Sequence, residues 1–237
     1  MRTNNKTVRK AARKSKRRVK RTQEVEKQDK NTPVEITLRN VSQRQAWKLL
    51  ETSPMTFLLG SAGSGKTFLA MAYAINEVLN NRRGHIVLTR PIVEAGEKLG
   101  FLPGTFGDKV NPYMQPLYDT MDVLLGKFSS KREIINKSIV LAPLCYMRGR
   151  TFNDAVCIFD EAQNATYTQL KLFLSRFGQN TQVIVTGDPQ QSDLPFEHVP
   201  LSTVMEKLKG VAGISTHQFT HADVVRHPLV AAILKKL

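Results

Sequence analysis

Gly60-Ser61-Ala62-Gly63-Ser64-Gly65-Lys66-Thr67 is a complete phosphate-binding loop. The apolar run 55–59 precedes it and a helical pattern over 68–79 follows, which is the strand-loop-helix context that the motif requires. Its glycines let the backbone aim N–H groups at phosphate oxygens, and the following helix turns its positive dipole end toward the anion. Lys66 is expected to hold the β- and γ-phosphates and Thr67 a Mg²⁺ ion. The sequence therefore predicts a nucleoside triphosphate bound along the whole loop.

The composition fits one globular domain with an appendage. The chain has 237 residues, of which 41% are hydrophobic, enough to bury a full core. No apolar segment approaches the roughly 20 residues that span a bilayer, and no hydrophobic signal stretch follows the basic N-terminus. We therefore expect a soluble, cytoplasmic protein with no membrane partner. Cys145 and Cys157 lie in or beside apolar runs without metal-site spacing, so both are expected to be buried, reduced thiols.

Positive charge gathers at the N-terminus. Residues 1–22 contain eleven basic residues and no acid, within a chain of net charge +15. Self-repulsion and few apolar residues predict a disordered tail over 1–33, ahead of a folded domain over 34–237. Cationic arms gain affinity by displacing counterions from polyanions, so RNA or single-stranded DNA is the expected partner, with a merely solubilising tail as the alternative. The tail residues expected to contact nucleic acid are Arg9, Lys10, Arg13, Lys14, Lys16, Arg17 and Arg18.

Strand-like and helix-like segments alternate beyond the tail. Short apolar runs between turn signals predict strands at 34–38, 55–59, 85–89, 139–141, 155–159 and 182–186. Helical patterns cover 42–51, 66–79 and 166–177, with Ser42 and Thr166 as N-caps and Gly178 as the last stop. This alternation predicts an α/β fold, a mostly parallel sheet with helices on both faces. Such sheets bind ligands outside the carboxyl ends of their strands.

Carboxylates and an amide follow the predicted strands at that edge. Asp160 and Glu161 follow strand 155–159, where Asp160 would share Mg²⁺ with Thr67 and Glu161 would polarise the attacking water. Gln191, beyond strand 182–186, can sense the γ-phosphate because an amide both donates and accepts. The alternatives are an acidic helix N-terminus for the two carboxylates and a polar turn for Gln191.

Four further segments carry a resemblance to a known family. They are 94–104 (EAGEKLGFLPG), 142–151 (APLCYMRGRT), 160–164 (DEAQN) and 223–228 (DVVRHP). In collinear order over about residues 40–237, they resemble the signature segments of the PhoH family. Its members are P-loop ATPases with a core similar to the first RecA-like domain of superfamily-one helicases. The resemblance implies a RecA-like P-loop fold that uses ATP and Mg²⁺, and it does not cover the basic tail.

The resemblance also implies roles for single residues. Gln43 resembles the helicase glutamine that reads adenine, with Gln45 as the weaker candidate. Gln163 completes the second nucleotide motif, and Gln191 matches the third. Arg226 resembles the late arginine that touches the γ-phosphate, either in its own subunit or in a neighbour. If it acts on a neighbour, the protein assembles as a homo-oligomer, and a ring is the closed solution for head-to-tail contacts. A ribonuclease partner is implied by the resemblance alone.

Arginines near the strand ends are the expected nucleic-acid contacts of the folded domain. Arg90 follows strand 85–89, at a place where helicases touch the nucleic-acid backbone. Arg148 and Arg150 flank a glycine and are expected to bind strand phosphates or to join subunits. The Pro- and Gly-rich insert 94–118 carries aromatic residues that would stack on bases or fill a packed loop.

The function expected is an oligomeric, helicase-like ATPase acting on RNA or single-stranded nucleic acid. Only about fifty residues follow Gly187, too few for a second lobe of roughly 100 residues, so unwinding by a monomer is not expected. A nucleoside kinase is one alternative, although two cysteines cannot supply its four-ligand zinc site. The other is a scaffold that uses ATP as a conformational ligand, against which the water-activating Glu161 argues.

Overall fold

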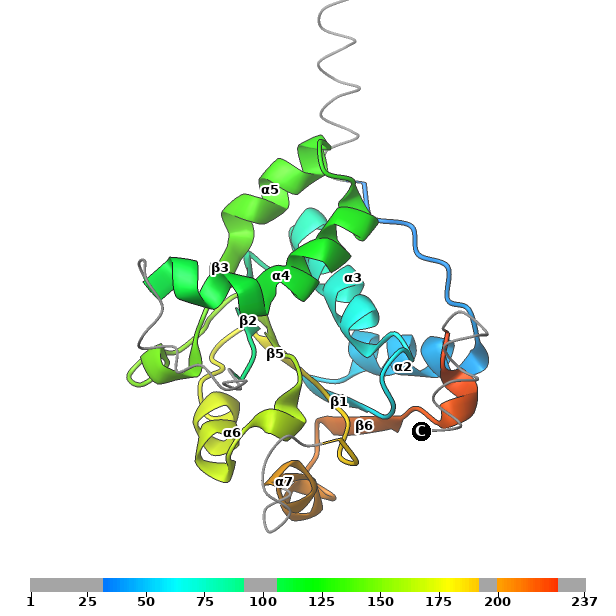
Figure 1. Cartoon of the computed structure of the whole chain (residues 1–237), viewed down its shortest axis with the longest axis vertical. Coiled ribbons are helices and arrows are strands. Elements are labelled where there is room, and N and C mark those ends of the chain that lie inside the picture. The colour runs from blue at the N-terminus through cyan, green and yellow to red at the C-terminus, as the bar shows by residue number, and fades with distance from the viewer. Residues whose placement is uncertain (1–31, 92–105, 192–199, 226–237) are drawn as a thin grey trace, which may run out of the picture.

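A six-stranded parallel sheet lies between two layers of helices in the computed structural model, which describes residues 32–91, 106–191 and 200–225 (Figure 1). The strands are β1 Met55–Leu59, β2 His85–Thr89, β3 Ile139–Leu141, β4 Ala155–Phe159, β5 Gln182–Gly187 and β6 Ile214–Gln218. They are ordered β3-β2-β4-β5-β1-β6, and every pair is parallel. The α-helices are α2 Val41–Thr52, α3 Lys66–Leu79, α4 Phe106–Leu125, α5 Ser130–Ser138, α6 Tyr167–Leu174 and α7 Pro200–Leu208. The predicted α/β class is confirmed.

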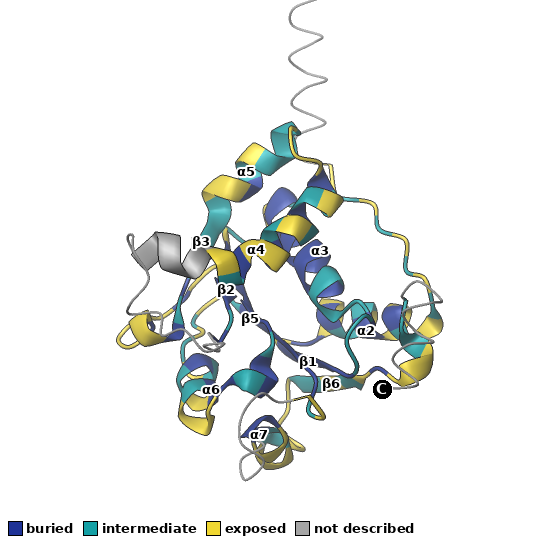
Figure 2. Cartoon of the chain, in the orientation of Figure 1, coloured by how far each residue is buried: buried dark blue, intermediate teal, exposed yellow. Residues whose placement is uncertain are grey.

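Each face of the sheet has its own hydrophobic cluster. Successive strand residues point to opposite faces, so Leu58 joins the cluster under α2, α3, α4 and α5 while Phe57 joins the cluster under α6 and α7. The central strands β1, β4 and β5 are buried along their whole length, and α3 is buried over nearly all of its surface (Figure 2). Strands covered on both faces read as continuous apolar runs, which is why these three were predictable.

The strand order brings the functional segments to one edge. β5 lies between β1, which leads into the phosphate-binding loop, and β4, which leads into Asp160 and Glu161. Because all strands run parallel, the residues that follow β1, β2, β4 and β5 leave the sheet at the same edge. β2 pairs with β4 so that Thr89 lies opposite Phe159, which makes the next residues of both strands neighbours.

The predicted strand 34–38 is wrong. Residues 34–38 pair with no strand of the described part of the chain, and the backbone of Val34 bonds to a side chain instead. Asn76 of α3 accepts from the Val34 N–H at 2.6 Å and donates to the Val34 carbonyl at 3.1 Å. The Arg39 N–H donates to Gln43 Oε1 at 2.9 Å. The segment is therefore tied to α3 and α2 rather than to the sheet.

Two predicted helix ends are also wrong. α2 begins at Val41 and its cap is Asn40, whose side chain accepts from the Gln43 N–H at 2.8 Å, rather than Ser42. α6 has the predicted Thr166 cap but ends at Leu174, before the predicted stop at Gly178. The chain then turns to an isolated parallel bridge between Phe177 and Phe152, which removes Phe177 from the helix.

The insert 94–118, for which base stacking and a packed loop were the two expectations, is helical from Phe106 onward. α4 contains Pro112 and Pro116, yet it buries Met114, Leu117 and Met121 against the cluster that includes α3. That burial offsets the hydrogen bonds that the prolines remove. The rest of the insert, including segment 94–104, lies outside the described residues. α5, α7 and β6 were not predicted.

The two cysteines differ in their surroundings. Cys157 in β4 is buried as predicted, and this burial raises the pKa of its thiol to about 12. Cys145 is exposed, so the prediction of a buried thiol is wrong for it. Its neighbour Leu144 takes the buried position in the short helix η2 (Leu144–Tyr146).

No helix within the described ranges is both long and apolar enough to cross a membrane.

Candidate nucleotide site

The phosphate-binding loop is held between two neighbours that leave no room for side chains on its glycines. Gly60 has φ of 126°, and a Cβ there would lie 2.3 Å from the Phe219 carbonyl oxygen. Gly65 caps α3 with φ of 91°, and a Cβ there would lie 2.9 Å from Nε2 of Gln43. Only glycine fits both positions without strain. The backbone path of the loop is therefore fixed by Phe219, directly after β6, on one side and by α2 on the other.

Lys66 lies over the loop that it follows. Its Nζ donates to the carbonyl oxygens of Gly60 and Ser61, the latter at 3.0 Å. Ser64 Oγ donates to the same Ser61 carbonyl at 2.9 Å. These bonds keep the ammonium group at the N-terminus of α3, where the helix dipole already favours an anion. The arrangement suits a phosphate group.

Asp160 is the polar centre of the site. Its side chain is 2% exposed, and Oδ1 accepts from Thr67 Oγ1 at 2.7 Å and from Thr186 Oγ1 at 2.6 Å. A carboxylate beside a hydroxyl offers the hard oxygen ligands that Mg²⁺ prefers, so Thr67 and Asp160 fit that ion. Thr186 was missed by sequence reasoning, and its signal was its place at the end of a strand beside β4.

Glu161 is held by an amide network. Its backbone is left-handed, with φ of 53° and ψ of 43°, a conformation that costs a non-glycine residue on the order of 1–3 kcal/mol. Its Oε2 accepts from Gln163 Nε2 at 2.6 Å, and Gln163 Oε1 accepts from the Asp188 N–H at 3.0 Å. Gln163 therefore ties the exit of β4 to the exit of β5. The sequence identified Gln163 as part of the motif but not this contact.

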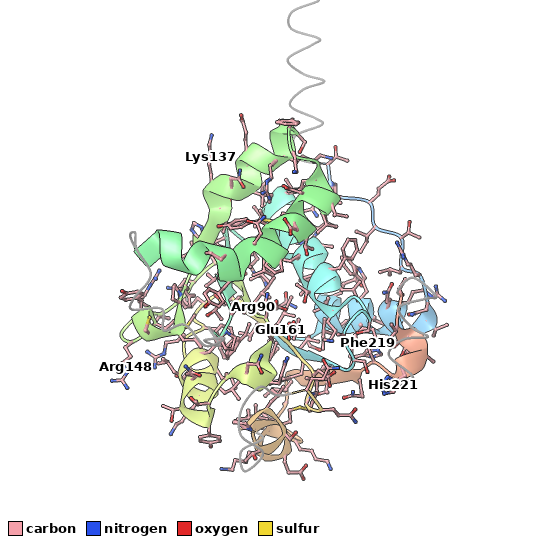
Figure 3. The ribbon with its side chains drawn as sticks, viewed as in Figure 1. Arg90, Lys137, Arg148, Glu161, Phe219 and His221 are labelled. Carbon is pink, nitrogen blue, oxygen red and sulfur yellow. The ribbon has the colours of Figure 1, made fainter. Side chains whose placement is uncertain are left out.

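Arg90 lies at the carboxylates. Its Nη1 is 3.9 Å from Asp160 Oδ2 and its Nη2 is 3.9 Å from Glu161 Oε1. Figure 3 shows Arg90 and Glu161 next to each other at the strand ends. This follows from the pairing of Thr89 with Phe159, since Arg90 and Asp160 are the next residues of the two strands. The residue predicted to contact nucleic acid is thus part of the nucleotide site.

A cavity of about 310 Å³ opens beside the loop. Gln43 forms its polar wall: the side chain is 5% exposed, and Nε2 donates to the Ser64 carbonyl at 3.1 Å. Its other walls come from the extended segment 34–37, from α3 and from the end of α4, and the apolar lining includes Val34, Ile36, Phe68 and Leu124. Polar side chains also line the cavity, among them Glu35 and Arg39, and this mixture of apolar walls and a buried amide suits a nucleotide base.

The segment after β6 packs against the loop. The Val225 N–H donates to the Gly63 carbonyl at 2.9 Å, and Ser61 Oγ is 3.1 Å from His221 Nδ1. The backbone N–H and hydroxyl of Thr220 donate to Asp223, and mainly the N–H lowers the pKa of that carboxyl. Arg226 itself lies outside the described residues.

Gln191, Arg148 and Arg150 make none of the contacts given above for this site within the described residues. Gln191 is exposed on a turn, where its N–H donates to the Asp188 carbonyl at 3.0 Å. Arg148 and Arg150 are exposed after η2, and Figure 3 shows Arg148 pointing away from Arg90. The Arg150 guanidinium lies 5.0 Å from the centre of the Phe152 ring. The basic tail lies outside the described residues.

A glycine-bounded loop between a strand and a helix, with Lys66 over it and Thr67 bonded to a strand-end carboxylate, defines a P-loop ATPase-type domain. Residues 35–237 match the family described as PhoH-like protein. The chain belongs to the PhoH family. The P-loop α/β fold predicted from the sequence agrees with the parallel sheet and with the loop between β1 and α3.

Curated relatives match the same region. A PhoH-like protein of Bacillus subtilis is 46% identical over 201 residues, covering 84% of this chain and 63% of the relative. Protein PhoH of Escherichia coli K12 is 40% identical over 199 residues, covering 82% of this chain and 56% of the relative. The chain thus spans about three-fifths of the length of the curated relatives it matches.

Solved structures show weaker likeness. The Pif1 helicase from Candida albicans superposes with a TM-score of 0.40 at 16% identity, covering 78% of this chain and 40% of the helicase. The SWI2/SNF2 ATPase core of Sulfolobus solfataricus, solved with double-stranded DNA, gives a TM-score of 0.43 at 14% identity over 70% of this chain and 34% of that core.

Proposed function

We propose that this protein hydrolyses ATP in a Mg²⁺-dependent reaction. The observation that carries the proposal is the contact of Thr67 with Asp160, next to Glu161. Mg²⁺ bound there would neutralise phosphate charge. Lys66 would bind the β- and γ-phosphates, and Glu161 would accept the proton of the attacking water. Asp160 is too enclosed by Thr67 and Thr186 to serve as that base.

The base of the nucleotide would occupy the cavity beside the loop, with Gln43 reading its edge. Gln43→Ala is expected to raise the KM for ATP about tenfold and to weaken the preference for ATP over GTP, with kcat nearly unchanged. Turnover of both nucleotides, measured as phosphate release, checks this and tests the proposed function. Gln45→Ala is the matched control, because Gln45 is exposed on the same helix. An unchanged nucleotide preference in Gln43→Ala would remove Gln43 from base recognition.

The ATPase would act on RNA or single-stranded DNA. Support comes from the charge of residues 1–22, which we propose to be a disordered arm, and from the exposed Arg148 and Arg150. Gln191, exposed beyond β5, would approach the γ-phosphate only if its turn closes over bound nucleotide. We propose a cytoplasmic location, because ATP and nucleic acid are both available there.

We propose that the protein works as an oligomer in which Arg226 reaches the γ-phosphate of a neighbour. Arg226→Ala should then bind ATP normally but turn it over slowly, by about 10³-fold or more if it acts as an arginine finger. Mixing it with Lys66→Ala protein should restore turnover, because mixed assemblies contain sites with both residues. Phosphate release over a titration of the two variants is the measurement. No rescue at any ratio would place Arg226 in its own subunit's site.

A further inference from the structure

One guanidinium faces the two carboxylates of the site. Arg90 approaches Asp160 and Glu161 at 3.9 Å each, through different nitrogens. Its side chain is 24% exposed, against 2% for Asp160 and 39% for Glu161. Arg90 is therefore close enough to influence both carboxylates and open enough to be reached from outside.

Each carboxylate oxygen of Glu161 has a polar neighbour in this arrangement. Oε1 faces Arg90, and Oε2 accepts the 2.6 Å hydrogen bond from Gln163. A carboxylate that acts as a general base must turn a lone pair to the attacking water. The contacts with Arg90 and Gln163 thus influence the direction in which the Glu161 carboxylate points.

The hold of Arg90 on Glu161 is weak enough to be exchanged. Charge-assisted N–H···O bonds are about 2.7–2.9 Å long, and partly exposed ion pairs beyond that length add little stability. A guanidinium binds phosphate oxygens through two parallel N–H groups, a stronger arrangement than either 3.9 Å contact. A phosphate that reached Arg90 would therefore draw it from Glu161.

We propose that Arg90 is the positioning residue that couples nucleic-acid binding to ATP hydrolysis. It holds Glu161 in the unbound protein, and a phosphate of the nucleic-acid strand takes the guanidinium and releases Glu161 toward the attacking water. Among the described residues, Gln163 then still holds Glu161, and Gln163 is linked through the Asp188 N–H to the end of β5. This inference rests on the proposed function, since it assigns the regulation of that same site.

Kinetics of Arg90 variants test the coupling. Arg90→Ala is expected to raise basal kcat about two- to fivefold, the worth of one partly exposed ion pair, with the KM for ATP unchanged. Oligouridylate or oligothymidylate should no longer stimulate it as they stimulate the wild type. Arg90→Lys keeps the positive charge but loses the two parallel N–H groups of the guanidinium. Its basal kcat and its stimulation by polymer should lie between those of the wild type and Arg90→Ala. Lys137→Ala, which removes an exposed cation of α5 far from the site, should match the wild type (Figure 3).

Three results would overturn the proposal. A lower basal kcat with a higher KM would mean that Arg90 serves the phosphates of ATP. Weaker polymer binding with unchanged basal kcat would leave it a simple strand contact. Full stimulation of Arg90→Ala by polymer would remove it from the coupling altogether.

Thermal unfolding supplies a readout that needs no turnover. In a double-mutant cycle of Arg90→Ala and Glu161→Gln without polymer, the changes in Tm should depart from additivity by about 1–3 °C. With oligouridylate or oligothymidylate bound, the changes in Tm of the two single variants should be additive, because Arg90 has then left Glu161. Additive changes in both conditions would refute the proposal. A wild type that never hydrolyses ATP would instead refute the proposed function, and the cycle would still report on Arg90.

Discussion

Glu161→Gln is expected to bind ATP as tightly as the wild type and to turn it over about 10²–10⁴-fold more slowly. An amide has the shape of the carboxylate but cannot accept a proton from water. Its oxygen can still accept the hydrogen bond that Gln163 Nε2 donates to Oε2, so the local structure should survive. Nucleotide titration and single-turnover phosphate release separate binding from chemistry.

The matched control is Glu133→Gln, the same chemical change at an exposed position of α5. It should alter neither binding nor turnover. If Glu161→Gln keeps wild-type turnover, another group activates the water. If it loses nucleotide binding as well, Glu161 shapes the site rather than acting as its base.

Deletion of residues 1–22 should cost nucleic-acid binding far more than any single arginine of the domain. When an arm makes six to ten phosphate contacts, its affinity for nucleic acid falls about 10³–10⁵-fold between 50 and 200 mM salt. Removing it should weaken binding of single-stranded RNA by about 10²-fold or more at low salt and flatten the salt dependence. ATP binding should be intact, because Gln43, Lys66, Thr67 and Asp160 all lie in the described domain.

Fluorescence anisotropy across a salt series is the measurement. Deletion of 23–31, a stretch of mixed charge, controls for shortening the chain. Equal affinities of the wild type and the 1–22 deletion at low salt would show that the arm is only a solubilising tail.

The strand-loop-helix unit 55–79 could be predicted to the residue because its signals are local. The glycines of the loop, the buried run of β1 and the pattern of α3 each point to one structure without reference to the rest of the chain. β6 could not be predicted in this way. Ile214–Gln218 is an edge strand, half exposed and polar, and only its pairing with β1 makes it a strand.

α4 shows tertiary packing overriding local preference. Pro112 and Pro116 argue for a loop, but burial of Met114 and Leu117 beside α3 stabilises the helix. In segment 34–38 the local pattern favours a regular element that does not form. Its apolar residues suit a strand, but the Asn76 side chain bonds to the backbone N–H and carbonyl of Val34.

The candidate site also contains features that local motifs predict and features that depend on tertiary structure. The gathering of Lys66, Thr67, Asp160 and Glu161 at one edge of the sheet could be predicted from motifs, and their roles toward phosphate and Mg²⁺ stay predictions. The contact of Arg90 with the carboxylates could not be assigned. It depends on β2 being the neighbour of β4 and on the register of that pair, which the sequence does not state.

The central claim is an ATPase driven by nucleic acid, and its most direct test is ATP turnover by the wild type at known oligomeric mass. Phosphate release would be measured with Mg²⁺ alone, with single-stranded RNA, with single-stranded DNA and with duplex. We expect turnover that a single-stranded polymer stimulates and that chelation of Mg²⁺ abolishes. Tight ATP binding with no turnover under every condition would contradict it and leave a nucleotide-bound scaffold.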